Sequence, residues 1–193
     1  MAERASLRET IARLSSPDTG AREAAAAELY RLGRALADGA VDHWRTEPSF
    51  AGLLAGTPTV GIAVQPDTFE KIRAANGSPR LAEVPPDQDA KEFELHFGRG
   101  IRLDILVTKS PGGGGAIARF LEKFGEGIQQ VEYEVTDVER ATEILRTRLG
   151  QQPIYPETRP GADGTRVNFF LAGTPEGKKV LIELVEGRRS ANT

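Results

Sequence analysis

A carboxylate inside an apolar strand is the clearest indication of chemistry in this sequence. Glu183 lies within residues 180–185, which are otherwise Val, Leu and Ile and are predicted to form a buried strand. A carboxylate in such a strand is costly to bury unless it is paired, protonated or bound to a ligand. We therefore expect Glu183 to line a polar cavity walled by strands.

Polar side chains alternate with apolar ones in two other predicted strands. The alternation places Glu94 and His96 of strand 92–97, and Glu132 of strand 128–135, on the side that faces the cavity. Glu94 and Glu132 are therefore candidates for substrate contact, and the three side chains are an alternative set of metal ligands. Carboxylates around His96 favour its protonated form. His96 is therefore a candidate general base or metal ligand, and the alternative is a solvated histidine in a hairpin.

The predicted strand at 166–171 offers further candidates. Asn168 and Phe170 are expected to point toward the cavity, where they could contact a substrate. Arg166 of the same strand is another candidate for substrate contact. Either Arg166 or Arg102 would neutralise the carboxylates of the cavity.

The composition excludes several classes of function. Hydrophobic residues make up 39% and charged residues 27% of the 193 positions, as in an ordinary soluble globular protein. The net charge of −3 gives no reason to expect binding to nucleic acid or to an anionic membrane. The chain has no cysteine, which excludes disulfides and thiolate chemistry. It shows no signal-peptide core and no apolar run of about 20 residues, so we expect a cytoplasmic protein.

Residues 1–56 are predicted to form a helical extension. Leu7, Ile11 and Leu14 recur at helical spacing, and a second helix is expected at 21–37, closed by Asp38-Gly39. We predict a helical hairpin that packs on the main domain or serves as a dimer arm.

From Pro58 onward, apolar residues recur at every second position. This period predicts strands at 59–64, 92–97, 101–107, 128–135, 166–171 and 180–185, with helices at 67–75, 117–124 and 138–149. Strand, helix and paired strands thus occur twice, in modules at 57–110 and 126–187, and residues 188–193 are expected to be a disordered tail. The glycine run at 112–115 lacks the Gly-Lys-Ser/Thr of a phosphate loop and is predicted to be a flexible linker. We predict an α+β fold whose modules form a curved mixed sheet around a cleft.

Three segments resemble the vicinal oxygen chelate superfamily, also called the glyoxalase and bleomycin-resistance fold, and within it the methylmalonyl-CoA epimerase branch. They are Thr-Val-Gly-Ile-Ala-Val at 59–64, the predicted helix and turn at 117–128, and the last third, with Tyr-Pro-Glu-Thr-Arg-Pro-Gly-Ala-Asp-Gly at 155–164 and Val-Leu-Ile-Glu-Leu-Val-Glu at 180–186. The resemblance is strong over 117–186, weaker over 58–108 and absent before residue 57. It implies paired βαβββ modules.

The resemblance also implies a divalent metal held by one residue on each of four strands. The corresponding positions here are Thr59, Asp104, Gln130 and Glu183. The terminal glutamate is kept, a shorter carboxylate stands at the second position, and both histidines of the family are replaced. Such an all-oxygen set suits Mg²⁺, Mn²⁺ or Ca²⁺. The alternative is a degenerate cavity in which Thr59 and Gln130 form hydrogen bonds.

In the epimerase branch, two glutamates move a proton at a carbon activated by a thioester. One corresponds to Glu183, and the other falls near Asp87-Gln88-Asp89, where no glutamate stands. The leading hypothesis is a metal-assisted isomerase or lyase that acts on a small carbonyl or acyl substrate. The alternatives are a metal-free protein that binds a small molecule, and a homodimeric interaction module that uses the helical arm.

Overall fold

The computed structural model describes residues 2–174, 177 and 179–187. Within these residues, seven strands form one mixed sheet with the order β2-β3-β1-β4-β7-β6-β5. The strands are β1 (Leu54–Ala63), β2 (Lys91–Phe97), β3 (Ile101–Val107), β4 (Gly127–Val135), β5 (Arg159–Pro160), β6 (Arg166–Gly173) and β7 (Lys179–Glu186). The helices are α1 (Ala2–Arg13), α2 (Thr19–Arg45), α3 (Pro48–Ala51), α4 (Pro66–Ala75), α5 (Ala116–Phe124) and α6 (Val138–Arg148), with short 3₁₀ turns at Gly98–Gly100 and Ala162–Gly164.

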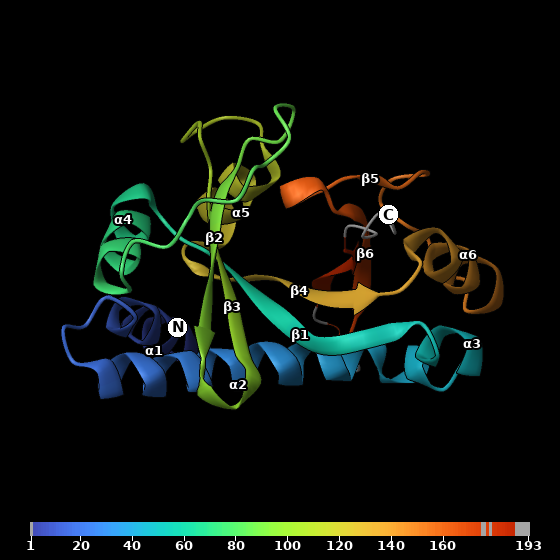
Figure 1. Cartoon of the computed structure of the whole chain (residues 1–193), viewed down its shortest axis with the longest axis horizontal. Helices are drawn as coiled ribbons and strands as arrows, with labels where there is room; N and C mark the ends of the chain where they lie inside the picture. The colour runs from blue at the N-terminus through green and yellow to red at the C-terminus, as the bar shows by residue number, and fades with distance from the viewer. Residues whose placement is uncertain (1, 175–176, 178, 188–193) are drawn as a thin grey trace, which may run out of the picture.

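The two predicted modules are related by an approximate two-fold axis between β1 and β4. These two strands pair antiparallel at the centre of the sheet, while β3 lies parallel to β1 and β7 lies parallel to β4. Gly61 pairs with Asp104 in the first module, as Glu132 pairs with Glu183 in the second. The predicted α+β fold with two modules in a curved mixed sheet is confirmed (Figure 1).

Some predicted boundaries were displaced. Strand β1 begins at Leu54, ahead of the expected module start at residue 57, and β5 was not expected. The glycine run does not stand apart from the fold, because a Cβ on Gly115 would lie 2.8 Å from a carboxylate oxygen of Asp89. The predicted tail at 188–193 lies outside the described residues.

Helix α2 lies along one face of the sheet and runs beneath β1, β3 and β4 (Figure 1). The predicted end at Asp38-Gly39 is wrong, since the helix continues through both residues to Arg45. Glycine within a helix costs about 1 kcal/mol relative to alanine. Buried residues on both sides of Gly39, including Ala37 and Trp44, pack against the sheet and outweigh that cost.

The helical face of the sheet is apolar and forms the main core. Its members share the parity opposite to the polar positions, as a strand requires. They include Val60, Ile62, Leu103, Ile105, Val131 and Ile182, which are all fully buried. The predicted helical hairpin therefore packs on the main domain.

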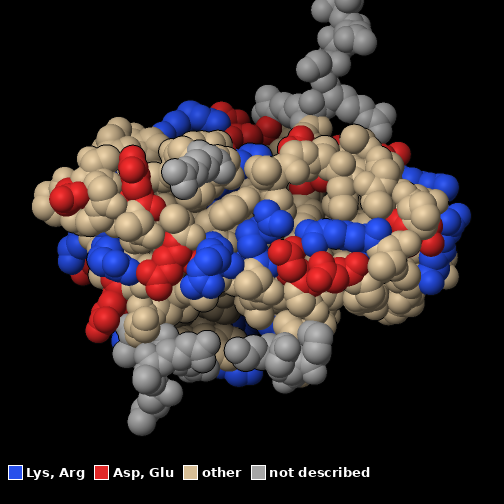
Figure 2. Space-filling view, turned by 90° about the horizontal axis from the view of Figure 1, so that it is seen from below, with Lys and Arg blue, Asp and Glu red and all other residues tan. Residues whose placement is uncertain are grey.

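One side of α2 carries a cluster of half-buried charges. Asp38 forms ion pairs with Arg34 (3.6 Å) and Arg45 (2.8 Å), and Arg45 also contacts Asp42 (3.0 Å). Figure 2 shows the molecule from below, where basic and acidic side chains alternate over the surface. Among the described helices, none is long and apolar enough to cross a membrane.

We predict opposite effects of substitution at two glycines of α2. A Cβ on Gly33 would lie 2.5 Å from Cγ1 of Val60, so Gly33→Ala should destabilise the fold by about 1–3 kcal/mol. Gly39 is exposed, so Gly39→Ala should stabilise the fold by about 0.5–1 kcal/mol. Urea unfolding of both variants measures the difference. Equal effects at the two positions would contradict this account of how α2 packs.

Candidate functional site

The polar face of the sheet encloses a cavity of about 800 Å³. Each long strand other than β1 contributes side chains from the positions that face away from α2. They include Glu92 and Glu94 of β2, Arg102 and Asp104 of β3, Gln130 and Glu132 of β4, Phe169 of β6, and Leu181 and Glu183 of β7. The cavity is therefore built by both modules, as expected for Glu183 and its neighbours.

Glu183 is 9% exposed and is held by an amide. Nε2 of Gln130 donates a hydrogen bond of 2.5 Å to Oε2 of Glu183, and the same nitrogen lies 3.3 Å from Oε1 of Glu132. Gln130 can reach both carboxylates because Gly61 stands opposite it on β1. A Cβ at Gly61 would lie 2.6 Å from Cγ of Gln130.

Asp104 is the most isolated carboxylate of the cavity. It is 5% exposed, and its Oδ1 atom has no hydrogen-bond partner among the described residues. A buried charged oxygen without a partner is unfavourable, so Asp104 must be protonated or meet a ligand.

Burial and mutual repulsion raise the pKa values of the cavity acids. Burial raises the pKa of Glu92 to about 7 and that of Glu132 to about 8, with neighbouring carboxylates adding to each. The same causes, burial first, raise the pKa values of Asp104 and Glu183 well above their usual range. These acids can therefore hold or exchange protons near neutral pH.

The remaining predicted residues of the first module differ in their surroundings. Glu94 lines the cavity rim and contacts Arg102 (3.1 Å) and His96 (2.9 Å). The side chain of His96 is 62% exposed and is not among the described residues that line the cavity, which fits the alternative of a solvated hairpin histidine. Thr59 is buried opposite Glu132 but does not line the cavity either.

The expectation that Asn168 and Phe170 face the cavity was wrong. Phe170 packs in the core against Trp44, with ring centroids 5.6 Å apart, and Asn168 is fully buried with its amide donating to the carbonyl of Tyr155. Phe169 lines the cavity instead, because it is the residue that pairs with Glu183. That pairing follows from the hairpin register, which the alternation within one strand did not reveal.

Arg166 also lies away from the cavity acids. Its guanidinium forms an ion pair with Glu139 at the start of α6 and donates to Thr158 (2.9 Å). Arg102, by contrast, lines the cavity and forms an ion pair with Glu94. Glu92 was overlooked as a site residue, although it shares the parity of Glu94.

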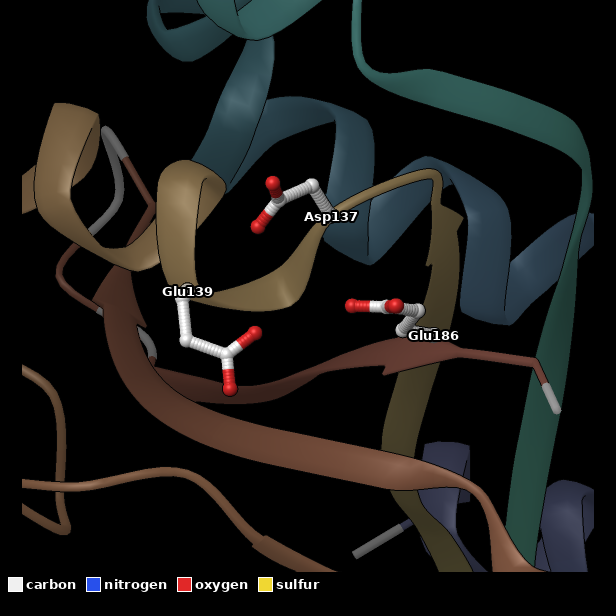
Figure 3. Close-up of side chains that lie close together, drawn as sticks. All are labelled: Asp137, Glu139 and Glu186. Atoms are coloured by element: carbon white, nitrogen blue, oxygen red, sulfur yellow. The ribbon is translucent and has the colours of Figure 1, made fainter. Parts of the chain in front are cut away.

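A second acidic group lies outside the cavity, at the start of α6. Ligand oxygens of Asp137, Glu139 and Glu186 lie within 4.8 Å of one another and could hold a metal ion (Figure 3). These carboxylates already serve the helix terminus: Asp137 accepts from the amide of Arg140 (2.8 Å), and Glu186 accepts from that of Val138 (2.9 Å). Helix capping therefore accounts for the group without an ion.

No family model matches the sequence, and the search of curated proteins found no match either. Solved structures do match. Methylmalonyl-CoA epimerase from Mycobacterium tuberculosis is 32% identical with a TM-score of 0.57, covering 71% of this chain and 91% of its own. The epimerase from Streptomyces coelicolor in complex with 2-nitronate-propionyl-CoA is 25% identical with a TM-score of 0.54, covering 70% and 99%. A hypothetical protein from Bacillus halodurans, BH1468, is 28% identical with a TM-score of 0.54, covering 70% and 96%.

We predict that the cavity acids weaken the fold as pH rises. Their raised pKa values mean that the folded chain keeps protons which the unfolded chain, with a glutamate pKa of 4.5, has released. This contribution lowers the unfolding free energy between pH 4.5 and about 8. Glu132→Gln mimics the protonated acid, so it should raise stability at pH 8 by more than about 1 kcal/mol and have little effect at pH 4.5.

Urea unfolding at both pH values measures this effect. Glu122→Gln, at an exposed position of α5, is the matched control and should leave the pH dependence unchanged. If the two variants change the unfolding free energy alike at both pH values, the pKa of Glu132 is not raised in the folded chain.

Proposed function

The chain belongs to the vicinal oxygen chelate superfamily, and from that membership we propose that it is an isomerase or lyase that moves a proton on a small acyl or carbonyl substrate in the acidic cavity. The observation that carries the proposal is the set of buried and half-buried carboxylates that line one cavity. Burial raises the pKa of Glu92 to about 7, that of Glu132 to about 8, and that of Glu183 well above its usual range. Groups of that kind are suited to general acid–base catalysis at physiological pH.

Glu183 and Glu92 are the pair we assign to proton transfer. Glu183 comes from the second module and Glu92 from the first, and both line the same cavity. A substrate between two modules can lose a proton to one carboxylate and regain one from the other, which inverts the carbon. Glu92 could also take the role of the second glutamate of the epimerase branch, because it lies a few residues after Asp87-Gln88-Asp89, where that glutamate is absent.

The carboxylates of the loop, Asp87 and Asp89, already have partners within the protein. Asp87 lies 2.5 Å from a guanidinium nitrogen of Arg159, and Oδ2 of Asp89 accepts a hydrogen bond of 2.6 Å from the hydroxyl of Thr108. That hydroxyl lowers the pKa of Asp89, which makes it a weaker base. Glu92, whose pKa burial raises to about 7, is better matched to the task.

A divalent cation fits the donor chemistry of the cavity. Asp104, with its unpartnered Oδ1, and the oxygens of Gln130, Glu132 and Glu183 would hold it, and hard oxygen donors favour Mg²⁺, Mn²⁺ or Ca²⁺. Such an ion would polarise the substrate carbonyl. Because Gln130 now donates to Glu183, its amide would have to turn to offer oxygen instead.

That same hydrogen bond favours a second candidate function. The amide of Gln130 satisfies Glu183 at 2.5 Å without any cation. A metal-free protein that binds a small molecule in the cavity, without catalysis, is the alternative this contact supports. The homodimer and the cytoplasmic location remain predictions.

Acyl-CoA esters are the first substrates to test. One related epimerase was solved with methylmalonyl-CoA and NH₄⁺, and another with 2-nitronate-propionyl-CoA. In deuterated water, the wild-type chain should invert (2R)-methylmalonyl-CoA and exchange its α-proton. Glu183→Gln and Glu92→Gln should each slow inversion by about 100-fold or more.

Loss of a single base should also separate deuterium exchange at the α-carbon from inversion, which occur together in the wild type. Each variant should retain deuterium exchange of one epimer, through the carboxylate that remains, while inversion is lost. Glu122→Gln is the control and should match the wild type. A wild type that does not invert methylmalonyl-CoA would exclude this ester as its substrate, and a fully active Glu92→Gln would show that Glu92 is not one of the two bases.

A metal titration distinguishes the acids of the cavity from the second acidic group at the start of α6. Titration with Mn²⁺, followed by calorimetry, should show a site that Asp104→Ala weakens at least about tenfold, as loss of a ligating carboxylate would. Asp137→Asn, in the second acidic group, should leave that site unchanged. If Asp104→Ala has no effect, or no Mn²⁺ binds, the metal-free alternative is favoured.

A further inference from the structure

Two segments from different modules meet over the cavity. Residues 79–90, between α4 and β2, belong to the first module, and residues 155–165, around β5, belong to the second (Figure 1). Both contribute to the cavity lining, yet some of their side chains are well exposed: Arg80 is 68% exposed and Asp87 is 61% exposed. Side chains that line a cavity and also face solvent mark its mouth.

Asp163 is the centre of one set of contacts between the segments. Its carboxylate accepts two hydrogen bonds from Arg80 (2.6 and 3.1 Å) and one from the amide of Glu83 (2.9 Å). The amide of Asp163 donates in return to the carbonyl of Glu83 (3.0 Å). Asp163 has a φ of +50°, a conformation that aspartate adopts more readily than most residues.

A second set of contacts lies alongside. Arg159 donates to Asp87 at 2.5 Å, and Nε2 of Gln88 donates to the carbonyl of Pro160 at 2.9 Å. The guanidinium of Arg159 lies over the ring of Tyr155, 4.4 Å from its centroid. The two sets span both segments, so they join the modules at a place where the sheet does not.

These contacts are of the kind that opens easily. Exposed ion pairs contribute little to stability, and salt screens them. The acids below are nearly inaccessible, since Asp104 is 5% and Glu183 is 9% exposed. Movement of part of the wall would widen the path by which a small molecule reaches them.

We propose that residues 79–90 and 155–165 form a clasp that shuts the mouth of the cavity and opens to let a ligand enter and leave. Arg80–Asp163 and Arg159–Asp87 hold it closed. Opening requires that these exposed pairs separate, together with the hydrogen bonds that join Glu83 to Asp163 and Gln88 to Pro160, while the paired strands of each module stay in place. The clasp is independent of the reaction assigned to the cavity.

A single introduced thiol tests the clasp, because the chain has no cysteine of its own. Leu106→Cys places the thiol on the cavity wall, where Leu106 is 3% exposed, and Glu122→Cys places one on the exposed face of α5. The rate of reaction with Ellman's reagent should be far lower for the first. Adding Arg80→Gln or Asp163→Asn should raise that low rate by roughly twofold to fivefold, as should 0.5 M NaCl.

Arg146→Gln is the matched control, since Arg146 forms an exposed ion pair with Glu143 on α6, outside the cavity. It should leave the Leu106→Cys rate unchanged. Hydrogen exchange of the full chain should show faster exchange at Glu83 and Asp163 in the clasp variants, with β1 and β4 unaffected. The proposal would be overturned if the Leu106→Cys labelling rate were the same with and without the clasp substitutions, or if the thiol stayed unreactive in all variants.

Discussion

The antiparallel pairing of β1 with β4 is the interaction on which the site depends. It joins the two modules into one sheet and sets Gly61 opposite Gln130 and Thr59 opposite Glu132. From this register, Asp104 follows on the β3 side and Glu183 on the β7 side. A slip of one residue would turn every acid of the cavity toward α2 and the apolar core that it covers. The register is protected by the apolar alternates, which are buried beneath the helix.

The fold could be predicted from the sequence to a large extent because periodicity reports which face of each strand is buried. Glu94 and Glu132 were placed correctly on the cavity side for that reason, whereas Asp104 was indicated by the family resemblance and Glu183 by the cost of burying a carboxylate in an apolar strand. Phe170 was misplaced because the cavity side of β6 is set by its pairing with β7, a contact between strands rather than a pattern within one. Helix α2 was predicted too short because local propensity at Gly39 says nothing of the sheet that covers Ala40 and Trp44.

The cavity keeps the superfamily's scaffold but has a different set of polar side chains. At the two positions where the resemblance expects histidines stand Thr59 and Gln130, and neither can be protonated near neutral pH. The titratable groups that remain are carboxylates, and burial, with mutual repulsion adding to it, raises the pKa values of Glu92 and Glu132 to about 7 and about 8, close to the range of histidine. Burial thus supplies, from acids alone, groups that titrate where imidazole would have done so.

Helix α2 has a further consequence for assembly. The related structures are covered over 91–99% of their length, whereas only 70–72% of this chain is matched, so nearly a third of it has no counterpart in them. The long helix covers the apolar face of the sheet and carries ion-paired side chains toward the solvent. The back of the sheet is therefore covered by the same chain, and any contact between subunits on that side would be made by α2 and not by the strands.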